Sequence, residues 1–181
     1  MVNLVIMRHG EAEPLSTNDS QRQLTTRGQH DVNQMALWLQ RHYAAFDWIW
    51  TSPYLRTRQT AELMLAKQAP FSQLEVIPEL VPDGDAGLFK ASFDARVSDK
   101  PDARVLLVSH MPLVSFLVEA FTKPEQAPVF STAHDAVKAM AEQQQIPLYQ
   151  FDHKEKKDTF ANRIRRERGV RDGIVFIGVA Q

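Results

Sequence analysis

The 181-residue sequence contains no cysteine, which excludes disulfide bonds and thiolate metal sites. It also lacks a long hydrophobic run. The apolar N-terminal segment is short, contains Asn3 and ends at Arg8, which fits neither a signal peptide nor a membrane span. An excess of one charge is absent too, because 21 basic and 22 acidic side chains leave a net charge of −1. We therefore expect a cytoplasmic protein with no nucleic-acid partner and no membrane contact.

Short apolar segments rich in β-branched residues alternate along the chain with segments of helical period. This alternation predicts an α/β fold with a largely parallel sheet. The length fits a single domain over residues 1–181. The predicted strands are Leu4–Met7, Trp48–Trp50, Leu74–Ile77 and Val105–Val108.

Three helices are predicted between or after these strands. The clearest runs from Thr26 to His42, with Thr25 or Thr26 as its cap, because its apolar residues recur every three to four positions. A second spans Leu55–Lys67, and a third opens at Pro112, a residue suited to a first helical turn. Proline and glycine punctuate the segment Glu79–Asp85, which we expect to be a loop.

Basic side chains follow several of the predicted strands, where parallel sheets bind their ligands. Arg8-His9-Gly10 follows the first strand, and a neutral imidazole beside a guanidinium is a competent nucleophile toward phosphorus. Arg56 opens a helix, where backbone N–H groups already favour an anion, and His110 lies between a strand and a helix. Each of these motifs, taken alone, could also be a chance match or contain a histidine with a purely structural role. Together they predict a phosphoryl site.

The chain resembles the histidine phosphatase superfamily, also called phosphoglycerate-mutase-like, and most of all its short SixA-type phosphohistidine phosphatases. The resemblance covers about residues 3–132. It implies a three-layer αβα sandwich without a large lid insertion. The matching segments, in the order of the family, are Met7-Arg8-His9-Gly10-Glu11-Ala12, Leu24-Thr25-Thr26-Arg27-Gly28, Ser52-Pro53-Tyr54-Leu55-Arg56 with Gln59-Thr60, Pro78-Glu79-Leu80 with Gly84-Asp85, and Ser109-His110-Met111-Pro112-Leu113-Val114.

By this resemblance, His9 is the residue that becomes phosphorylated, and Arg8, Arg56 and His110 bind the phosphoryl group. Two arginines and a cationic His110 can carry the charge, so neither a metal nor a cofactor is expected. The proton donor to the leaving group is less defined. Glu79, directly after a strand, is the first choice among the available carboxylates, although a loop role is open for it.

The absence of a large lid insertion suggests what kind of substrate the site accepts. Without a lid the site is open, and an open site admits a phosphorylated histidine displayed on a signalling or phosphotransfer protein. A small phosphomonoester is the alternative substrate. A second alternative is a non-catalytic binding module that recruits its partner through a basic tail.

The C-terminal segment, residues 133–181, departs from the family pattern. Residues 154–181 hold 8 basic and 4 acidic side chains, among them Arg163, Arg165, Arg166 and Arg168. The sequence predicts a helical stretch over Thr132–Gln145, a charged segment over Lys154–Arg171, and strands at Pro147–Phe151 and Ile174–Val179. Whether these strands complete the same sheet is open at this point.

Overall fold

The computed structural model describes residues 2–15, 17–121, 148–151 and 174–179. Six strands and four α-helices, with two short 3₁₀ helices, follow one another along these residues. The strands are β1 (Asn3–Arg8), β2 (Trp48–Thr51), β3 (Gln73–Val76), β4 (Arg104–Ser109), β5 (Leu148–Phe151) and β6 (Ile174–Val179). The helices are η1 (Asp19–Gln21), α1 (Thr26–His42), α2 (Leu55–Leu65), η2 (Pro78–Leu80), α3 (Ala86–Val97) and α4 (Leu113–Phe121).

The strands form one sheet in the order β3-β2-β4-β1-β6-β5, and each neighbouring pair is parallel. The strand β4 lies between β1 and β2, although it follows both of them in the sequence. The chain therefore leaves β1, passes to the β3 edge and returns to the centre. Because all strands run the same way, their carboxyl ends lie along one edge of the sheet.

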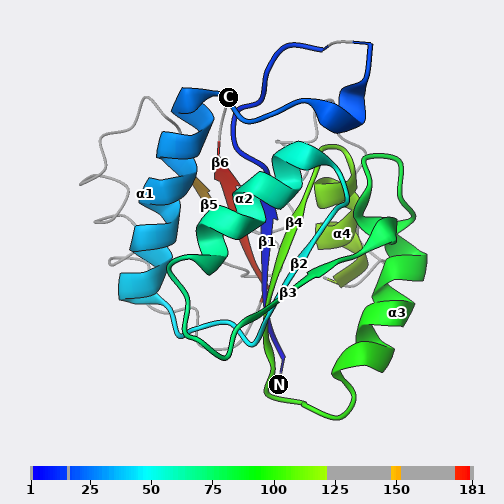
Figure 1. Cartoon of the computed structure of the whole chain (residues 1–181). Coiled ribbons are helices and arrows are strands. Elements are labelled where there is room, and N and C mark those ends of the chain that lie inside the picture. The colour runs from blue at the N-terminus through cyan, green and yellow to red at the C-terminus, as the bar shows by residue number, and fades with distance from the viewer. Residues whose placement is uncertain (1, 16, 122–147, 152–173, 180–181) are drawn as a thin grey trace.

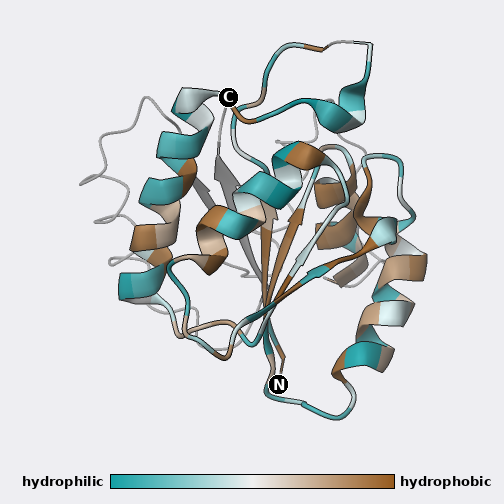
Figure 2. Cartoon of the chain, in the orientation of Figure 1, coloured by the Kyte–Doolittle hydropathy of each residue, from teal (hydrophilic) through white to brown (hydrophobic). Residues whose placement is uncertain are grey.

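Helices cover both faces of the sheet (Figure 1). The helices α1 and α2 pack on one face, where they bury Val5 and Met7 of β1. The helices α3 and α4 pack on the other face, where they bury Leu4 and Ile6. Alternate residues of β1 thus enter opposite cores, as the pleat of a strand requires. Figure 2 shows the result, with hydrophobic strands at the centre and a hydrophilic outer side on α1.

This architecture confirms the predicted three-layer αβα sandwich with a parallel sheet. The helix α1 spans the predicted residues, and Thr25 caps it by accepting a hydrogen bond from the N–H of Gly28 at 2.9 Å. Two other helix boundaries were slightly wrong, because α2 ends at Leu65 and α4 begins one residue after Pro112. The segments Thr132–Gln145 and Lys154–Arg171 lie outside the described residues. The two C-terminal strands do join the sheet, since β6 pairs with β1 and β5 pairs with β6.

The helix α3 was not predicted. It begins after Asp85, whose carboxylate accepts a hydrogen bond from the N–H of Leu88 at 2.9 Å and so caps the helix. It buries only Phe89, Phe93 and Val97, at four-residue spacing. This narrow apolar stripe gives a weak signal in the sequence. In the parts of the chain that the structure describes, no helix is long and apolar enough to cross a membrane.

Candidate active site

Three of the predicted site residues converge at the carboxyl ends of the central strands, namely Arg8, His9 and His110. Arg8 is paired with Ser109 at the ends of β1 and β4, and Thr51 is paired with Val108 at the ends of β2 and β4. The next residues along each chain segment are His9, Ser52 and His110, which therefore lie close together. The His9 and His110 rings stand edge to face, with 5.3 Å between their centroids.

His9 is buried, and its surroundings fix its tautomer. Its Nδ1 lies 2.6 Å from the carbonyl oxygen of Gly10, which can only accept a hydrogen bond, so Nδ1 carries the hydrogen. In the neutral ring Nε2 is then left with its lone pair. That nitrogen accepts a hydrogen bond from Nε of Arg56 at 3.2 Å. The nucleophilic position of the imidazole is therefore Nε2.

Burial lowers the pKa of His9 from 6.5 to about 3, with help from the positive charges of Arg8 and Arg56 and against the opposing effect of the Gly10 hydrogen bond. A proton on Nε2 would place a third positive charge beside two guanidinium groups in a desolvated site. The imidazole is consequently neutral near pH 7. A neutral imidazole with a free lone pair is the form that can attack phosphorus.

Arg56 lies in the first turn of α2 and is 3% exposed. Besides its bond to His9, it donates through Nη1 to the carbonyl oxygen of Asp19 at 2.7 Å and through Nη2 to the Asp19 carboxylate at 3.1 Å. Both ends of the guanidinium are thus fixed, and its Nε side faces His9. Burial lowers the pKa of Arg56, and the Asp19 charge opposes this effect.

Two further guanidinium groups add to the positive field. Arg8, half-buried at the end of β1, has an Nε that is buried without a hydrogen-bond partner among the described residues. Burial, together with Arg56 and Arg22, lowers the pKa of Arg8. Arg22 is held by Asp19, whose carboxylate accepts a hydrogen bond from Nε of Arg22 at 2.7 Å. The Asp19 carboxylate thus holds Arg22 and Arg56, and the positive charges of Arg8, Arg22 and Arg56 together favour an anion in the site.

His110 is held by Ser52, with 2.7 Å between its Nε2 and the serine hydroxyl. The ring also contacts Tyr54 edge to face, at 5.0 Å between centroids. Its Nδ1 is buried and has no partner among the described residues. If the Ser52 hydroxyl donates to Nε2, then Nδ1 carries the hydrogen and is a free donor. A buried donor without an acceptor is a place for a ligand oxygen.

The charge state expected for His110 differs from the one that the structure supports. Burial, together with the neighbouring His9, Arg56 and Arg8, lowers its pKa from 6.5 to about 2. The ring is therefore neutral when the site holds no anion, whereas the sequence reasoning assigned it a positive charge. The reason is that the same arginines that attract a phosphoryl group also disfavour an imidazolium among them.

The loop that carries His9 is fixed by backbone contacts. The N–H of Gly10 donates to the Thr60 hydroxyl at 3.1 Å, and this hydroxyl donates to the carbonyl oxygen of Arg56 at 2.8 Å. Thr60 thereby couples the His9 loop to the helix that carries Arg56. On the other side, α1 approaches so closely that a Cβ on Gly28 would collide with the carbonyl oxygen of Glu11. This contact explains why glycine is needed at position 28.

Glu79, the predicted proton donor, lies in η2 after β3 and is exposed. Its side chain is not among the hydrogen-bond partners of His9, Arg56 or His110 in the described part of the chain. Its neighbour Leu80 does contact the site segment, because its carbonyl oxygen accepts a hydrogen bond from the Ser109 hydroxyl at 2.8 Å. The role of Glu79 stays a prediction.

Sequence reasoning missed Asp19, Arg22, Ser52 and Thr60. Ser52 and Thr60 belong to segments that had been singled out, but nothing in their spacing reveals a partner 58 or 50 positions away. Asp19 and Arg22 lie in a polar loop without apolar periodicity, and their three-residue spacing is a weak signal. Within the described residues, no group of three His, Asp or Glu side chains could hold a metal ion. The arrangement offers a neutral nucleophile, positive charge and a buried donor around one small anion.

Comparisons with known proteins agree with one another. Residues 4–81 match the Histidine phosphatase superfamily (branch 1). The chain is 39% identical over 132 residues to the phosphohistidine phosphatase SixA of Escherichia coli (strain K12), which covers 73% of this chain and 81% of the relative. It is 32% identical over 126 residues to the SixA homolog of Haemophilus influenzae, which covers 65% of this chain and 75% of that protein. A solved structure of the protein histidine phosphatase SixA with tungstate superposes with a TM-score of 0.62 at 40% identity, over 71% of this chain and 82% of that one.

Proposed function

The chain belongs to the histidine phosphatase superfamily, and we propose that it dephosphorylates a phosphohistidine carried by a signalling or phosphotransfer protein. The observation that carries this proposal is the state of His9, whose Nε2 lone pair faces Arg56 while Nδ1 is held by Gly10. Both relatives described above are named for phosphohistidine phosphatase activity. The structural relative holds tungstate, a tetrahedral oxyanion like phosphate.

The first step is an in-line attack of His9 Nε2 on phosphorus. A bond forms between Nε2 and phosphorus, and the bond from phosphorus to the leaving imidazole nitrogen breaks. The electron pair of the broken bond goes to that nitrogen, which takes up a proton. Glu79 is our candidate for the donor of this proton. Arg56 must release His9 as the phosphoryl group enters between them.

The second step is hydrolysis of the phosphoenzyme. Water attacks phosphorus, and the bond to Nε2 breaks with its electron pair returning to Nε2. The proton that the water loses goes to the group that donated a proton in the first step, inorganic phosphate is released, and the His9 ring is neutral again. Arg8 and Arg56 would bind the phosphoryl oxygens, and Nδ1 of His110 would donate to one of them. None of these roles needs a metal or a cofactor. The incoming phosphoryl charge also reverses the environment of His110, because an adjacent anion favours the protonated ring.

A substrate comparison tests this function. The purified protein is incubated with a histidine-phosphorylated carrier domain and, separately, with a panel of small phosphomonoesters. We expect the carrier to be the better substrate, and His9→Ala to abolish hydrolysis while the fold persists. A consistent preference for the phosphomonoesters would transfer the protein to the metabolite phosphatases. Undiminished hydrolysis by His9→Ala would remove His9 from the mechanism.

A further inference from the structure

Exposed apolar side chains lead away from His110 along the start of α4. Pro112 is exposed two residues after His110, and Phe116 is 52% exposed one turn later. The N–H of Phe116 donates to the carbonyl oxygen of Pro112 at 3.4 Å, so Pro112, in the turn just before α4, lies one turn away from Phe116. The other residues of this turn, Leu113, Val114 and Ser115, are buried.

A third exposed apolar side chain comes from the neighbouring helix. The helices α3 and α4 pack together, and a Cβ on Gly84, just before α3, would lie 3.1 Å from Leu113 at the start of α4. The first turns of the two helices are therefore adjacent. Leu88, in the first turn of α3, is 70% exposed. We call Leu88, Pro112 and Phe116 the apolar rim.

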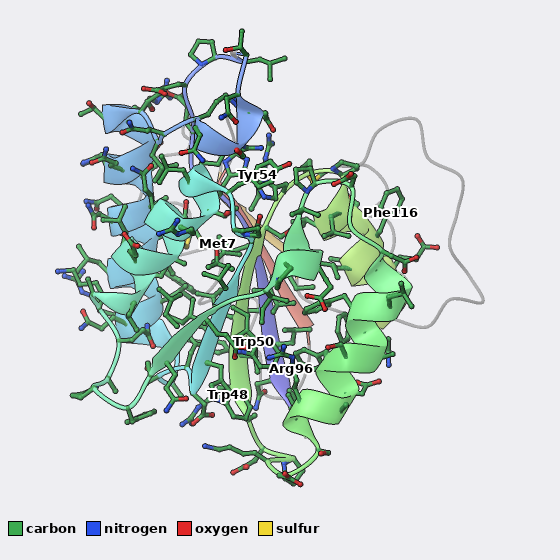
Figure 3. All side chains as sticks on the ribbon, turned by 45° about the vertical axis from the view of Figure 1, so that its right-hand side comes forward. Met7, Trp48, Trp50, Tyr54, Arg96 and Phe116 are labelled. Carbon is green, nitrogen blue, oxygen red and sulfur yellow. The ribbon has the colours of Figure 1, made fainter. Side chains whose placement is uncertain are left out.

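The apolar rim lies at the same end of the sheet as the site. In Figure 3, Phe116 and the site residue Tyr54 lie toward one end of the molecule and Trp48 toward the other. The N–H of Val114 donates to the carbonyl oxygen of His110 at 2.8 Å, and the N–H of Phe116 donates to that of Pro112 at 3.4 Å, so the Phe116 backbone lies within about two helical turns, roughly 10 Å, of His110. A typical protein interface covers about 800 Å² per partner, or a disc of about 16 Å radius. A protein docked over His9 would therefore reach the rim, whereas a small phosphomonoester would not.

We propose that the apolar rim is the docking surface for the folded protein that carries the phosphohistidine, and that this protein presents an apolar patch beside its phosphorylated side chain. The proposal rests on the proposed function. The two surfaces bind different parts of the substrate protein: the arginine cluster binds the phosphoryl group, and the rim supplies aromatic and aliphatic contact area. Covering the exposed Phe116 side chain in the complex removes apolar surface from water, which lowers the free energy of binding.

The chain offers a matched control for this surface. Phe71 is 56% exposed, close to the 52% of Phe116, but it lies in the turn that precedes β3. That turn is at the amino end of the strands, opposite the site. The variants Phe116→Ser and Phe71→Ser thus remove the same side chain at similar exposure from opposite ends of the sheet.

The experiment measures kcat and KM with two substrates, free phosphohistidine and the histidine-phosphorylated carrier that the unmodified enzyme dephosphorylates fastest. We expect Phe116→Ser to raise KM for the carrier by about 10-fold at unchanged kcat, as loss of an interface anchor does. Leu88→Ser should shift KM in the same direction. Neither variant should change the kinetics with free phosphohistidine, and Phe71→Ser should leave both substrates unaffected.

The outcomes separate the two levels of inference. If Phe116→Ser and Leu88→Ser match the unmodified enzyme on the carrier, the docking surface is wrong while the proposed function stands. If both substrates suffer equally, the residues act on the site rather than on docking, and the proposal is again wrong. If the unmodified enzyme dephosphorylates free phosphohistidine but none of the carriers, the proposed protein substrate fails and the docking surface fails with it.

Discussion

Acidification should destabilise the folded protein through His9 and His110. Their pKa values are about 3 and about 2 in the fold, against 6.5 for an ordinary histidine. Above 6.5 both rings are neutral in the folded and the unfolded chain, so the histidines cost nothing there. As the pH falls below 6.5, the unfolded chain takes up protons on both rings and the folded protein does not. Stability is therefore lost from about pH 6.5 downward, toward the folded pKa values.

Linkage gives the size of this loss. Between about pH 7.5 and about pH 5.5, one histidine that stays neutral in the fold costs about 1.4 kcal/mol, and two cost about 3 kcal/mol. Urea unfolding at both pH values, in buffers free of phosphate, measures the total decline. The variants His9→Gln and His110→Gln remove one titrating ring each, so each should show a decline smaller by about 1.4 kcal/mol. An equal decline in the unmodified protein and in both variants would refute the buried neutral state.

Three further substitutions test single contacts. Thr60→Val leaves the N–H of Gly10 without its acceptor and should lower the free energy of unfolding by about 1–3 kcal/mol. Thr60→Ser keeps the hydroxyl and is the control. Urea midpoints compare the two variants, and equal midpoints would contradict the role of Thr60. Gly28→Ala places a Cβ against the Glu11 carbonyl and should cost about 1–3 kcal/mol in the same assay, and a neutral result would show that α1 can shift. Arg56→Lys keeps the charge but loses the guanidinium fork, so inhibition by inorganic phosphate should weaken by at least about 10-fold, whereas an unchanged inhibition constant would exclude bidentate binding.

Much of the fold could be predicted from the sequence, because helix caps and apolar periodicity favour the same elements that the packing stabilises. The helix α1 shows both a capping threonine and a wide apolar stripe, and the structure gives it the predicted bounds. The central strands β1 and β4 are short β-branched runs buried on both faces. Family membership and the αβα architecture are confirmed. The single-domain organisation over residues 1–181 stays a prediction, as do the cytoplasmic location and the absence of a cofactor.

The candidate site was only partly readable from the sequence. His9, Arg56 and His110 follow predicted strands, and topology then brings them together; their catalytic roles stay a proposal. The hydrogen bonds between Arg56 and Asp19 could not be predicted from the sequence, because Asp19 lies in a loop 37 positions away. The neutral state of His110 was equally hidden, since a pKa depends on burial and on neighbouring charges that a sequence does not order in space.

Isolation of the phosphoenzyme tests the central claim most directly. The protein is mixed with a phosphohistidine carrier and quenched in alkaline denaturant, because the phosphorus–nitrogen bond is labile in acid. Peptide mapping and phosphorus NMR then locate the phosphoryl group. We predict it on Nε2 of His9, since Nδ1 is engaged by Gly10. A phosphoryl group on another residue, on Nδ1 of His9, or on no residue during rapid turnover would contradict this account.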